Sequence, residues 1–424
     1  MNMLFSGEMR CSAKLQFRGD QRCAKLEFRA TFSGEKNMQN FVFQNATKII
    51  FGKDTESMVG KEVQAFTTKV LLHYGSGSIK KSGLYGRVCA SLKEAGVAWI
   101  ELSGVQPNPR LSLVQKGIEL CRKEQIGFIL AVGGGSTIDS AKAIAVGVPY
   151  QGNVWDFFER KADITQALPL GVVLTIPAAG SESSNSAVVT KEEGWYKKDI
   201  GSELIRPKFA IMNPALTLTL SVEQTMIGIA DIIAHMTERY FTQVPNVEMT
   251  DRLLEANIKT VMHNAYILYA DPQNYDARAE IMWAGTLAHN DLLSTGRIGD
   301  WASHMIEHEL SGIYDVAHGA GLATVIPAWM QYVYKENINK FAQFANRVFD
   351  VEPDFDAPHL TALEGIKRFK QFYHSLGLPV SLKELGVPED RLEEMAAKCT
   401  AKGPVGNFKK LSKQDVVNIY KLAR

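Results

Sequence analysis

The stretch Ile129-Leu-Ala-Val-Gly-Gly-Gly-Ser-Thr-Ile-Asp-Ser-Ala-Lys142 joins an apolar run to three glycines and a helical segment. Glycine has no Cβ, so the backbone amides of Gly133, Gly134 and Gly135 can approach a ligand closely. The start of the following helix offers unpaired N–H groups and a partial positive charge. This order indicates a phosphate-binding turn. The alternative is a tight turn without a ligand, because the pattern is neither Gly-x-Gly-x-x-Gly nor a P-loop.

Short apolar runs on both sides of this stretch alternate with longer mixed segments between Phe41 and about Leu220. Segments such as Pro109–Glu124 have a helical period. Strand–helix alternation predicts an α/β, dinucleotide-binding domain with a mostly parallel sheet and helices on its faces. The runs predicted as strands are Lys48–Phe51, Val70–Tyr74, Val97–Leu102, Ile126–Val132, Val172–Ile176 and Phe209–Met212.

The sequence changes character after Ser221, where long helical patterns replace strand-like runs. The predicted helices are Val222–Phe241, Val247–Tyr269, Ala277–Thr295, Trp301–Ile313 and Ile338–Val348. Ser221 stands three residues before Gln224, which is the spacing of a helix-capping box. We therefore expect domains at 38–220 and 221–424, the second all-helical, with residues 1–37 as an extension that is disordered or artefactual.

Composition excludes several classes of protein. The 424 residues include 46% hydrophobic and 22% charged residues, and the net charge is +1, which gives no global attraction to nucleic acid or membrane. No apolar run reaches the roughly 18 residues that span a bilayer. The cysteines are scattered and odd in number, which favours a reducing cytoplasm over a disulfide framework. They are Cys11, Cys23, Cys89, Cys121 and Cys399.

A second glycine-rich turn, Gly75-Ser-Gly-Ser78, follows the predicted strand Val70–Tyr74. Two such turns fit the two ends of a dinucleotide, although this one alone is also compatible with a plain turn. It contains no acidic residue to accept from a ribose 2′-hydroxyl, and Lys80 and Lys81 follow at once. We therefore expect Gly75 and Ser78 to bind the cofactor and NADP(H) to be favoured over NAD(H). The alternative is that the lysines are simply solvated and that either cofactor binds.

Histidines gather in the second half of the chain. Asp231 and His235 are spaced i, i+4, which places them on one helical face. His304, His308 and His318 follow within a short segment. A single histidine on an apolar helix is more often a core residue. A carboxylate inside an apolar helix needs a partner, however, and one Asp with three His suits Zn²⁺ or Fe²⁺.

Taken together, these motifs resemble the iron-containing (group III) alcohol dehydrogenase family, in particular its butanol dehydrogenase and aldehyde reductase branch. The resemblance covers Met38–Arg424 and rests on an ordered set of motifs. They are Gly-Gly-Gly-Ser-x-x-Asp-x-x-Lys, then Asp-x-x-x-His, then His304-Met-Ile-Glu-His308 through His318-Gly319. Two departures are Asn213-Pro214 where Asp-Pro is usual, and Pro177-Ala-Ala-Gly-Ser where a Thr-rich segment is usual.

The resemblance implies a role for each matching residue. The implied metal ligands are Asp231, His235, His304 and His318, with His308 as a catalytic histidine beside the substrate. The implied dinucleotide contacts are Gly134, Gly135, Ser136 and Asp139, joined by Asn108, Thr175 and Lys197.

The expected activity is hydride transfer between a nicotinamide cofactor and a small primary alcohol or aldehyde, in a cleft between the domains, with Fe²⁺ favoured and Zn²⁺ as the alternative. The family also implies a homodimer. Three alternatives stay open: a glycerol or other polyol dehydrogenase, the related dehydroquinate synthase scaffold, and a nucleotide-binding sensor that is not an enzyme.

Overall fold

The computed structural model describes residues 37–424, which form one compact unit. The extension predicted for residues 1–37 therefore lies, apart from Asn37, outside the described residues. Within the described part, no helix is both long enough and apolar enough to cross a membrane.

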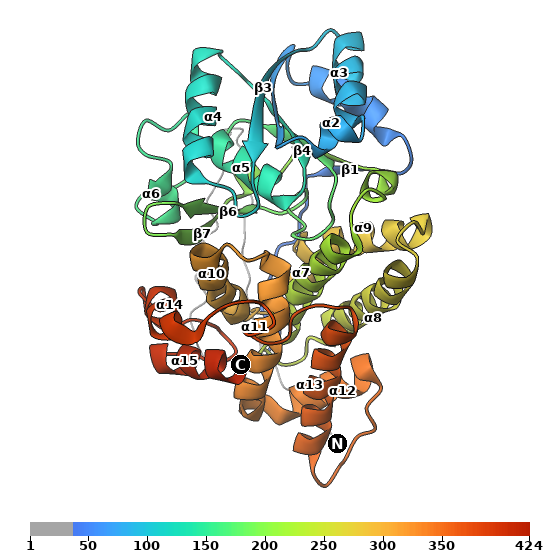
Figure 1. Ribbon diagram of the computed structural model, residues 1–424, viewed down its shortest axis with the longest axis vertical. Helices are drawn as coiled ribbons and strands as arrows, with labels where there is room; N and C mark the ends of the chain where they lie inside the picture. Colours follow the sequence, from blue (N-terminus) through green and yellow to red (C-terminus); the bar gives the residue numbers. More distant parts are fainter. Residues whose placement is uncertain (1–36) are drawn as a thin grey trace, which may run out of the picture. The chain divides into compact units, whose positions relative to one another are not determined.

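A six-stranded sheet forms the core of the first half of the described chain (Figure 1). All of its neighbouring strands are parallel, in the order β1-β8-β5-β4-β2-β3. Each predicted run corresponds to one of these strands, so the predicted parallel sheet is confirmed. The strands are β1 (Lys48–Phe51), β2 (Lys69–Gly75), β3 (Ala98–Val105), β4 (Ile129–Gly133), β5 (Leu170–Leu174) and β8 (Phe209–Met212).

Helices cover both faces of the sheet, which explains why its central strands are apolar without alternation. Leu72 and Leu130 face one apolar cluster, which includes residues of α1 and α3. Leu71 and Ile129 face the opposite cluster, which includes residues of α4 and α5. The helices of this half are α1 (Val59–Gln64), α2 (Ser78–Lys81), α3 (Leu84–Glu94), α4 (Leu111–Lys123), α5 (Gly135–Gly147) and α6 (Trp155–Phe158).

The side of the sheet on which successive strands are added changes between β2 and β4, although the strands stay parallel. From β2 the chain goes to β3 on one side, and from β3 it crosses back to β4 on the other side of β2. Tyr74 lies opposite Val132, so the turns after Gly75 and Gly133 lie side by side. Ligands of open α/β sheets bind outside the carboxyl ends of the strands at such a switch point.

Two further strands were not predicted. Strands β6 (Ser186–Lys191) and β7 (Tyr196–Gly201) form an antiparallel pair in which Thr190 lies opposite Lys197. The β7 sequence, Tyr-Lys-Lys-Asp-Ile-Gly, contains too few apolar residues to stand out as a strand, and the apolar run of β6 is only Ala-Val-Val. This pair carries Lys197 toward the second half of the chain.

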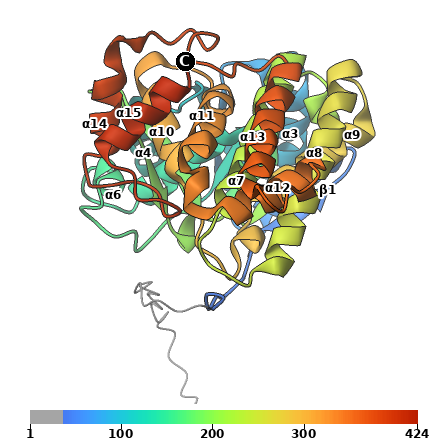
Figure 2. The ribbon, with the colours of Figure 1, turned by 90° about the horizontal axis from the view of Figure 1, so that it is seen from below.

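The second half is helical, as predicted. Figure 2 shows α7 between α8 and α11, against both of which it packs. The predicted helix Ala277–Thr295 was wrong at its end: α9 ends at His289, and Asp291 has a left-handed backbone with a φ of 73°. The helices are α7 (Val222–Tyr240), α8 (Glu248–Ala270), α9 (Tyr275–His289), α10 (Ala302–Tyr314), α11 (His318–Val333), α12 (Ile338–Phe349), α13 (Pro358–Ser375), α14 (Leu392–Cys399) and α15 (Lys413–Leu422).

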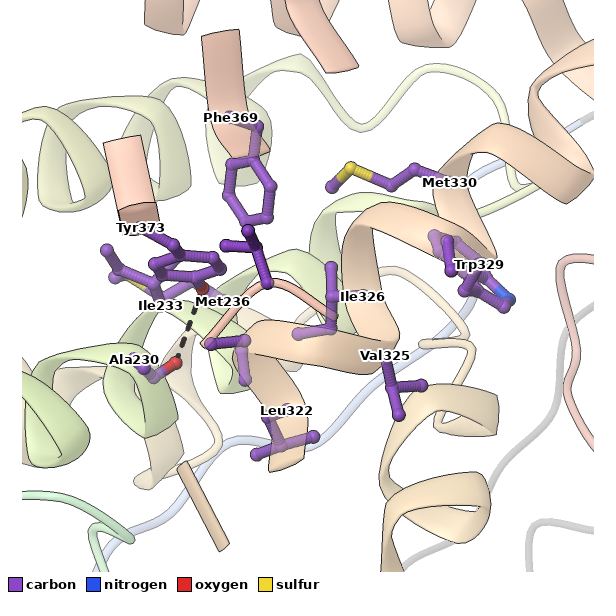
Figure 3. Close-up of a cluster of buried hydrophobic side chains, with 14 of the residues drawn as sticks. Ala230, Ile233, Met236, Leu322, Val325, Ile326, Trp329, Met330, Phe369 and Tyr373 are labelled. Carbon is purple, nitrogen blue, oxygen red and sulfur yellow. Dashed lines mark hydrogen bonds between the residues drawn. The ribbon is translucent and has the colours of Figure 1, made fainter. Parts of the chain in front are cut away.

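Helices α7, α11 and α13 share an apolar core (Figure 3). Ile233 of α7, Ile326 of α11 and Phe369 of α13 are almost completely buried in it. The Tyr373 hydroxyl donates to the carbonyl oxygen of Ala230 at 3.5 Å, which ties α13 to α7 next to Asp231. This packing fixes the helices that carry the acidic and histidine residues of the predicted site.

Candidate metal and dinucleotide site

Three of the four predicted metal ligands converge. Asp231 of α7, His304 of α10 and His318 of α11 each offer a ligand atom, and these atoms lie within 4.8 Å of one another. The fourth residue, His235, adjoins this group without completing it. Its ring centroid is 4.7 Å from that of His304, and its Nδ1 lies 2.8 Å from the carbonyl oxygen of Asp231.

Gly319 allows α7 and α11, which carry Asp231 and His318, to approach each other closely. A Cβ at Gly319 would lie 2.0 Å from the carbonyl oxygen of Ile227, which is closer than any real contact. The residue after His318 must therefore be glycine for α11 to begin against α7. This close approach brings His318 Nε2 to 3.9 Å from the Asp231 carboxylate.

Two atoms of the cluster are buried without a hydrogen-bond partner among the described residues. They are His304 Nε2 and Asp231 Oδ1, which lies 3.2 Å from His235 Nδ1 but is not hydrogen-bonded to it. Burial acts to raise the pKa of Asp231, but His235, His318 and His304 outweigh it and hold that pKa below its usual range. Burial and the neighbouring histidines lower the pKa of His304 well below its usual value, which favours the neutral ring. A carboxylate oxygen and a neutral imidazole nitrogen left unpaired together are suited to a metal ion.

His308 and Lys197 lie beside His318. The ring centroids of His308 and His318 are 5.6 Å apart, and Lys197 Nζ lies 3.3 Å from His318 Nδ1. Glu307, His308 and His318 also form a group with ligand-like spacing. Lys197 Nζ is 3.6 Å from the Glu307 carboxylate, however, so a cationic side chain already occupies that position.

The glycine-rich turn leads directly from β4 into α5, with Gly134 as the N-cap. A Cβ at Gly133 would lie 2.4 Å from Thr137 Oγ1, and one at Gly134 would lie 3.2 Å from Ile176. Gly135 and Ser136 form the first turn of α5. Their N–H groups therefore have no carbonyl oxygen of the helix to which they can donate.

Two other predicted cofactor contacts have their polar atoms engaged within the protein. The Asp139 carboxylate accepts from Ser181 Oγ at 2.6 Å and from the Val188 N–H at 2.9 Å. Asn108 Nδ2 donates to Asp315 at 2.9 Å, just before α11. Of the other predicted contacts, Gly75 ends β2 and Thr175 follows β5, while Ser78 begins α2.

A buried lysine organises the segment between β5 and β6. Lys142 Nζ donates to the carbonyl oxygens of Ser181, Ser184 and Ser186 at 2.7–2.9 Å. It also contacts the hydroxyls of Ser181 and Ser184. Burial lowers the pKa of Lys142 to about 8. The Asp-x-x-Lys portion of the motif thus holds this segment against α5.

Residues 46–214 match the family described as iron-containing alcohol dehydrogenase, and residues 225–424 match the C-terminal part of the same family. The chain belongs to the iron-containing alcohol dehydrogenase family. It is therefore an oxidoreductase of alcohols and aldehydes with a nicotinamide cofactor, in a family described as iron-containing.

Similar members of the family align along almost their whole length. The chain is 44% identical over 384 residues to the probable NADH-dependent butanol dehydrogenase 1 of Bacillus subtilis (strain 168), covering 91% of this chain and 99% of that protein. It is 33% identical over 369 residues to the NADPH-dependent aldehyde reductase YqhD of Escherichia coli (strain K12), covering 86% and 94%. The crystal structure of NADH-dependent butanol dehydrogenase A from Thermotoga maritima has a TM-score of 0.88 and 42% identity, covering 91% of this chain and 99% of that one.

In this alcohol dehydrogenase, two carboxylates beside the cluster were missed by the sequence analysis. Glu238 lies 3.0 Å from His304 Nδ1, and Glu307 contacts His318 Nδ1. Burial raises the pKa of Glu238 to about 7, against backbone N–H donors that favour its charged form. Burial acts in the same direction on Glu307, but His318 and Lys197 hold its pKa below the usual range. Both are acids inside apolar helices, which is the same signal that identified Asp231.

Two aromatic neighbours of the cluster were missed as well. The His289 ring centroid is 4.3 Å from that of His235, and its Nδ1 is buried without a hydrogen-bond partner among the described residues. Trp301 lies edge-on to His304 at 5.3 Å and has a left-handed backbone with a φ of 67°. No spacing in the sequence connects His289 to the other histidines, because the end of α9 brings it there.

Proposed function

We propose that this alcohol dehydrogenase interconverts small primary alcohols and their aldehydes. The names of its butanol dehydrogenase relatives support this substrate class. We further propose that Asp231, His235, His304 and His318 hold one divalent metal ion. The observation that carries the proposal is the pair of buried, unpartnered atoms, Asp231 Oδ1 and His304 Nε2, that face one cluster.

The residues present fit such an ion. One carboxylate and three imidazoles are ligands that suit both Fe²⁺ and Zn²⁺, and they leave a position open for substrate. His235 Nδ1 is directed to the Asp231 carbonyl, which leaves its Nε2 as the ligand atom. We propose Fe²⁺ as the metal, in accordance with the family, with Zn²⁺ as the alternative.

When bound, the metal supplies a Lewis acid for the substrate oxygen, and the nicotinamide supplies or accepts the hydride. The side chains of the protein would transfer the proton and limit the access of water. His308 lies beside His318, where it could exchange a proton with a substrate hydroxyl. The apolar burial of α7 and α10 around the cluster limits the access of water, which strengthens its electrostatic interactions.

The two glycine-rich turns would bind the two ends of the dinucleotide. Gly134, Gly135 and Ser136 present backbone N–H groups for the diphosphate at the start of α5. Gly75 and Ser78 stand at the neighbouring strand end, where the adenosine ribose would lie. We retain Asn108, Asp139, Thr175 and Lys197 as proposed contacts on the nicotinamide side.

We propose NADP(H) over NAD(H) as the cofactor. The acidic side chain on the neighbouring strand, Glu101, already accepts from the Tyr74 hydroxyl at 2.6 Å and from Tyr85, and lies 3.6 Å from Lys80. Those contacts engage both of its oxygens, and the turn Gly75–Ser78 itself contains no acidic residue. Because the Bacillus subtilis relative is named NADH-dependent, the assay must compare both cofactors.

We also propose that the enzyme is a cytoplasmic homodimer with domains at 38–220 and 221–424. The scattered cysteines support a reducing compartment. The change from strand–helix alternation to helices alone between β8 and α7 supports the domain boundary.

The experiment is a panel of initial rates with protein reconstituted with Fe²⁺ or Zn²⁺. Butanal, 1-butanol and glycerol would each be tested with both cofactors in the appropriate redox state. We expect kcat/KM for butanal with NADPH to be the highest value, and expect chelation to abolish it. A preference for glycerol would contradict the proposed substrate, and a preference for NADH would contradict the proposed cofactor.

A further inference from the structure

We infer that Glu238 and Glu307 are positioning residues for the metal site, because their carboxylates fix the tautomer and ring orientation of His304 and His318. This inference rests on the ligand set given under the proposed function. A histidine binds a metal through one ring nitrogen only when the other carries the proton, and an acceptor that faces the second nitrogen sets that arrangement.

Glu238 is held from α7 against the start of α10. Its Oε1 accepts from the His304 backbone N–H at 2.9 Å and lies 3.0 Å from His304 Nδ1. Its Oε2 accepts from the Trp301 N–H at 2.7 Å. Both oxygens accept from backbone N–H groups, which favour the charged carboxylate, and in that form the group acts toward the ring as an acceptor. The proton then lies on Nδ1, and the lone pair of the unpartnered Nε2 points into the cluster.

Glu307 is the acceptor that faces Nδ1 of His318. It is completely buried, with Oε2 against His318 Nδ1, the Ser311 hydroxyl on Oε1 and Lys197 Nζ at 3.6 Å. A Cβ at Gly321 would lie 2.6 Å from Glu307 Oε1, so a glycine there makes room for the carboxylate. His318 Nδ1 also has Lys197 Nζ at 3.3 Å, but Glu307 Oε2 is closer, so we assign the Nδ1 proton to the Glu307 contact. That proton leaves His318 Nε2 on the side of Asp231, at 3.9 Å.

Glutamine is the informative replacement because it keeps the size of the side chain. Its amide can turn and donate N–H to Nδ1, which moves the ring proton to Nε2 and removes the ligand lone pair. It also removes a negative charge from a buried position near the cation. Replacing a hydrogen-bond partner of this kind typically weakens metal affinity about 10- to 100-fold.

The test is Zn²⁺ binding by chelator-stripped enzyme, measured by competition with a chromogenic chelator, for wild type, Glu238→Gln, Glu307→Gln and Glu255→Gln. Glu255 is the matched control: it is a buried helical acid that accepts from the Tyr240 hydroxyl at 2.8 Å and contacts Arg347 at 3.2 Å. We expect each of the first two variants to raise the Zn²⁺ Kd at least about tenfold, and the control to stay within about twofold of wild type.

Because Glu238 also bonds the start of α10, its replacement can destabilise the fold, so the melting temperature of each stripped variant is recorded. If Glu238→Gln does not fold, Glu307→Gln decides the question. A purely structural role predicts a lower melting temperature with an unchanged Kd in the folded protein, and that result overturns the inference. If wild type itself fails to bind Zn²⁺ or Fe²⁺, the proposed function fails instead, which is a distinguishable outcome.

Discussion

His73 in β2 and His304 in α10 are both buried histidines, but their ring nitrogens are satisfied differently. His73 Nδ1 lies 2.9 Å from the Leu102 carbonyl oxygen, and its Nε2 lies 2.9 Å from Ser140 Oγ. His304 has Glu238 at Nδ1 and no hydrogen-bond partner among the described residues at Nε2. Burial lowers the pKa of both rings. Burial and a low pKa therefore do not identify a ligand, and the proposal for His304 rests instead on an unpaired nitrogen that shares a cluster with Asp231.

Replacement of His304 with Ala should have the largest effect. It removes one of four ligands, so the metal should be lost and kcat/KM should fall on the order of 10³-fold or more, because several kcal/mol of charge stabilisation disappear. Metal content and initial rates measure this. The exposed His359→Ala is the control and should match wild type. A His304→Ala enzyme that retains one metal per chain and its rate would show that the ligand assignment is wrong.

His73 should affect stability and its dependence on pH. The pKa of His73 is lowered to about 4 in the folded protein, below the roughly 6.5 of the unfolded chain. Its contribution to the free energy of unfolding is therefore fully present above about pH 6.5. As the pH falls from 6.5 toward 4, about 3 kcal/mol of that free energy is lost.

Urea unfolding of stripped wild type and His73→Gln at pH 7 and at pH 4.5 measures this term. The metal ligands titrate in both proteins, so the difference between the two pH dependences isolates His73. We expect the wild type to lose more unfolding free energy than the variant. Equal losses would mean that His73 is protonated as readily in the folded protein as in the unfolded chain.

His308→Ala should have a smaller effect on the rate than His304→Ala and none on the metal. The ring is adjacent to His318 but is outside the proposed ligand set. We expect unchanged metal content and a kcat reduced on the order of 10²-fold, which is at the low end for a group that assists proton transfer. Loss of the metal from this variant would place His308 among the ligands.

The sheet could be predicted because each of its strands is an apolar run between helices. Strand β7 could not, since its Tyr-Lys-Lys-Asp-Ile-Gly sequence has no such run. Helix α11 could not either, because Gly319, Gly321 and Pro327 weaken its helical pattern. The packing in Figure 3 stabilises that helix where its own propensity does not.

The cluster itself was predictable only in part. The i, i+4 spacing of Asp231 and His235 and the nearby histidines indicated a site, but His289 is brought there by the end of α9. Glu238 and Glu307 carried a usable signal, an acid within an apolar helix, but their partners lie 66 and 11 residues away. Such contacts are set by how α7, α10 and α11 pack, and no local pattern records them.

The most direct test of the account is the position of the metal. Crystals of enzyme loaded with Zn²⁺ would be measured on both sides of the zinc absorption edge to obtain an anomalous difference map. We predict one peak per chain, bounded by Asp231 Oδ1 and by Nε2 of His235, His304 and His318, at about 2.0–2.2 Å from each. A peak at another set of side chains, or no peak in fully loaded protein, would contradict the account.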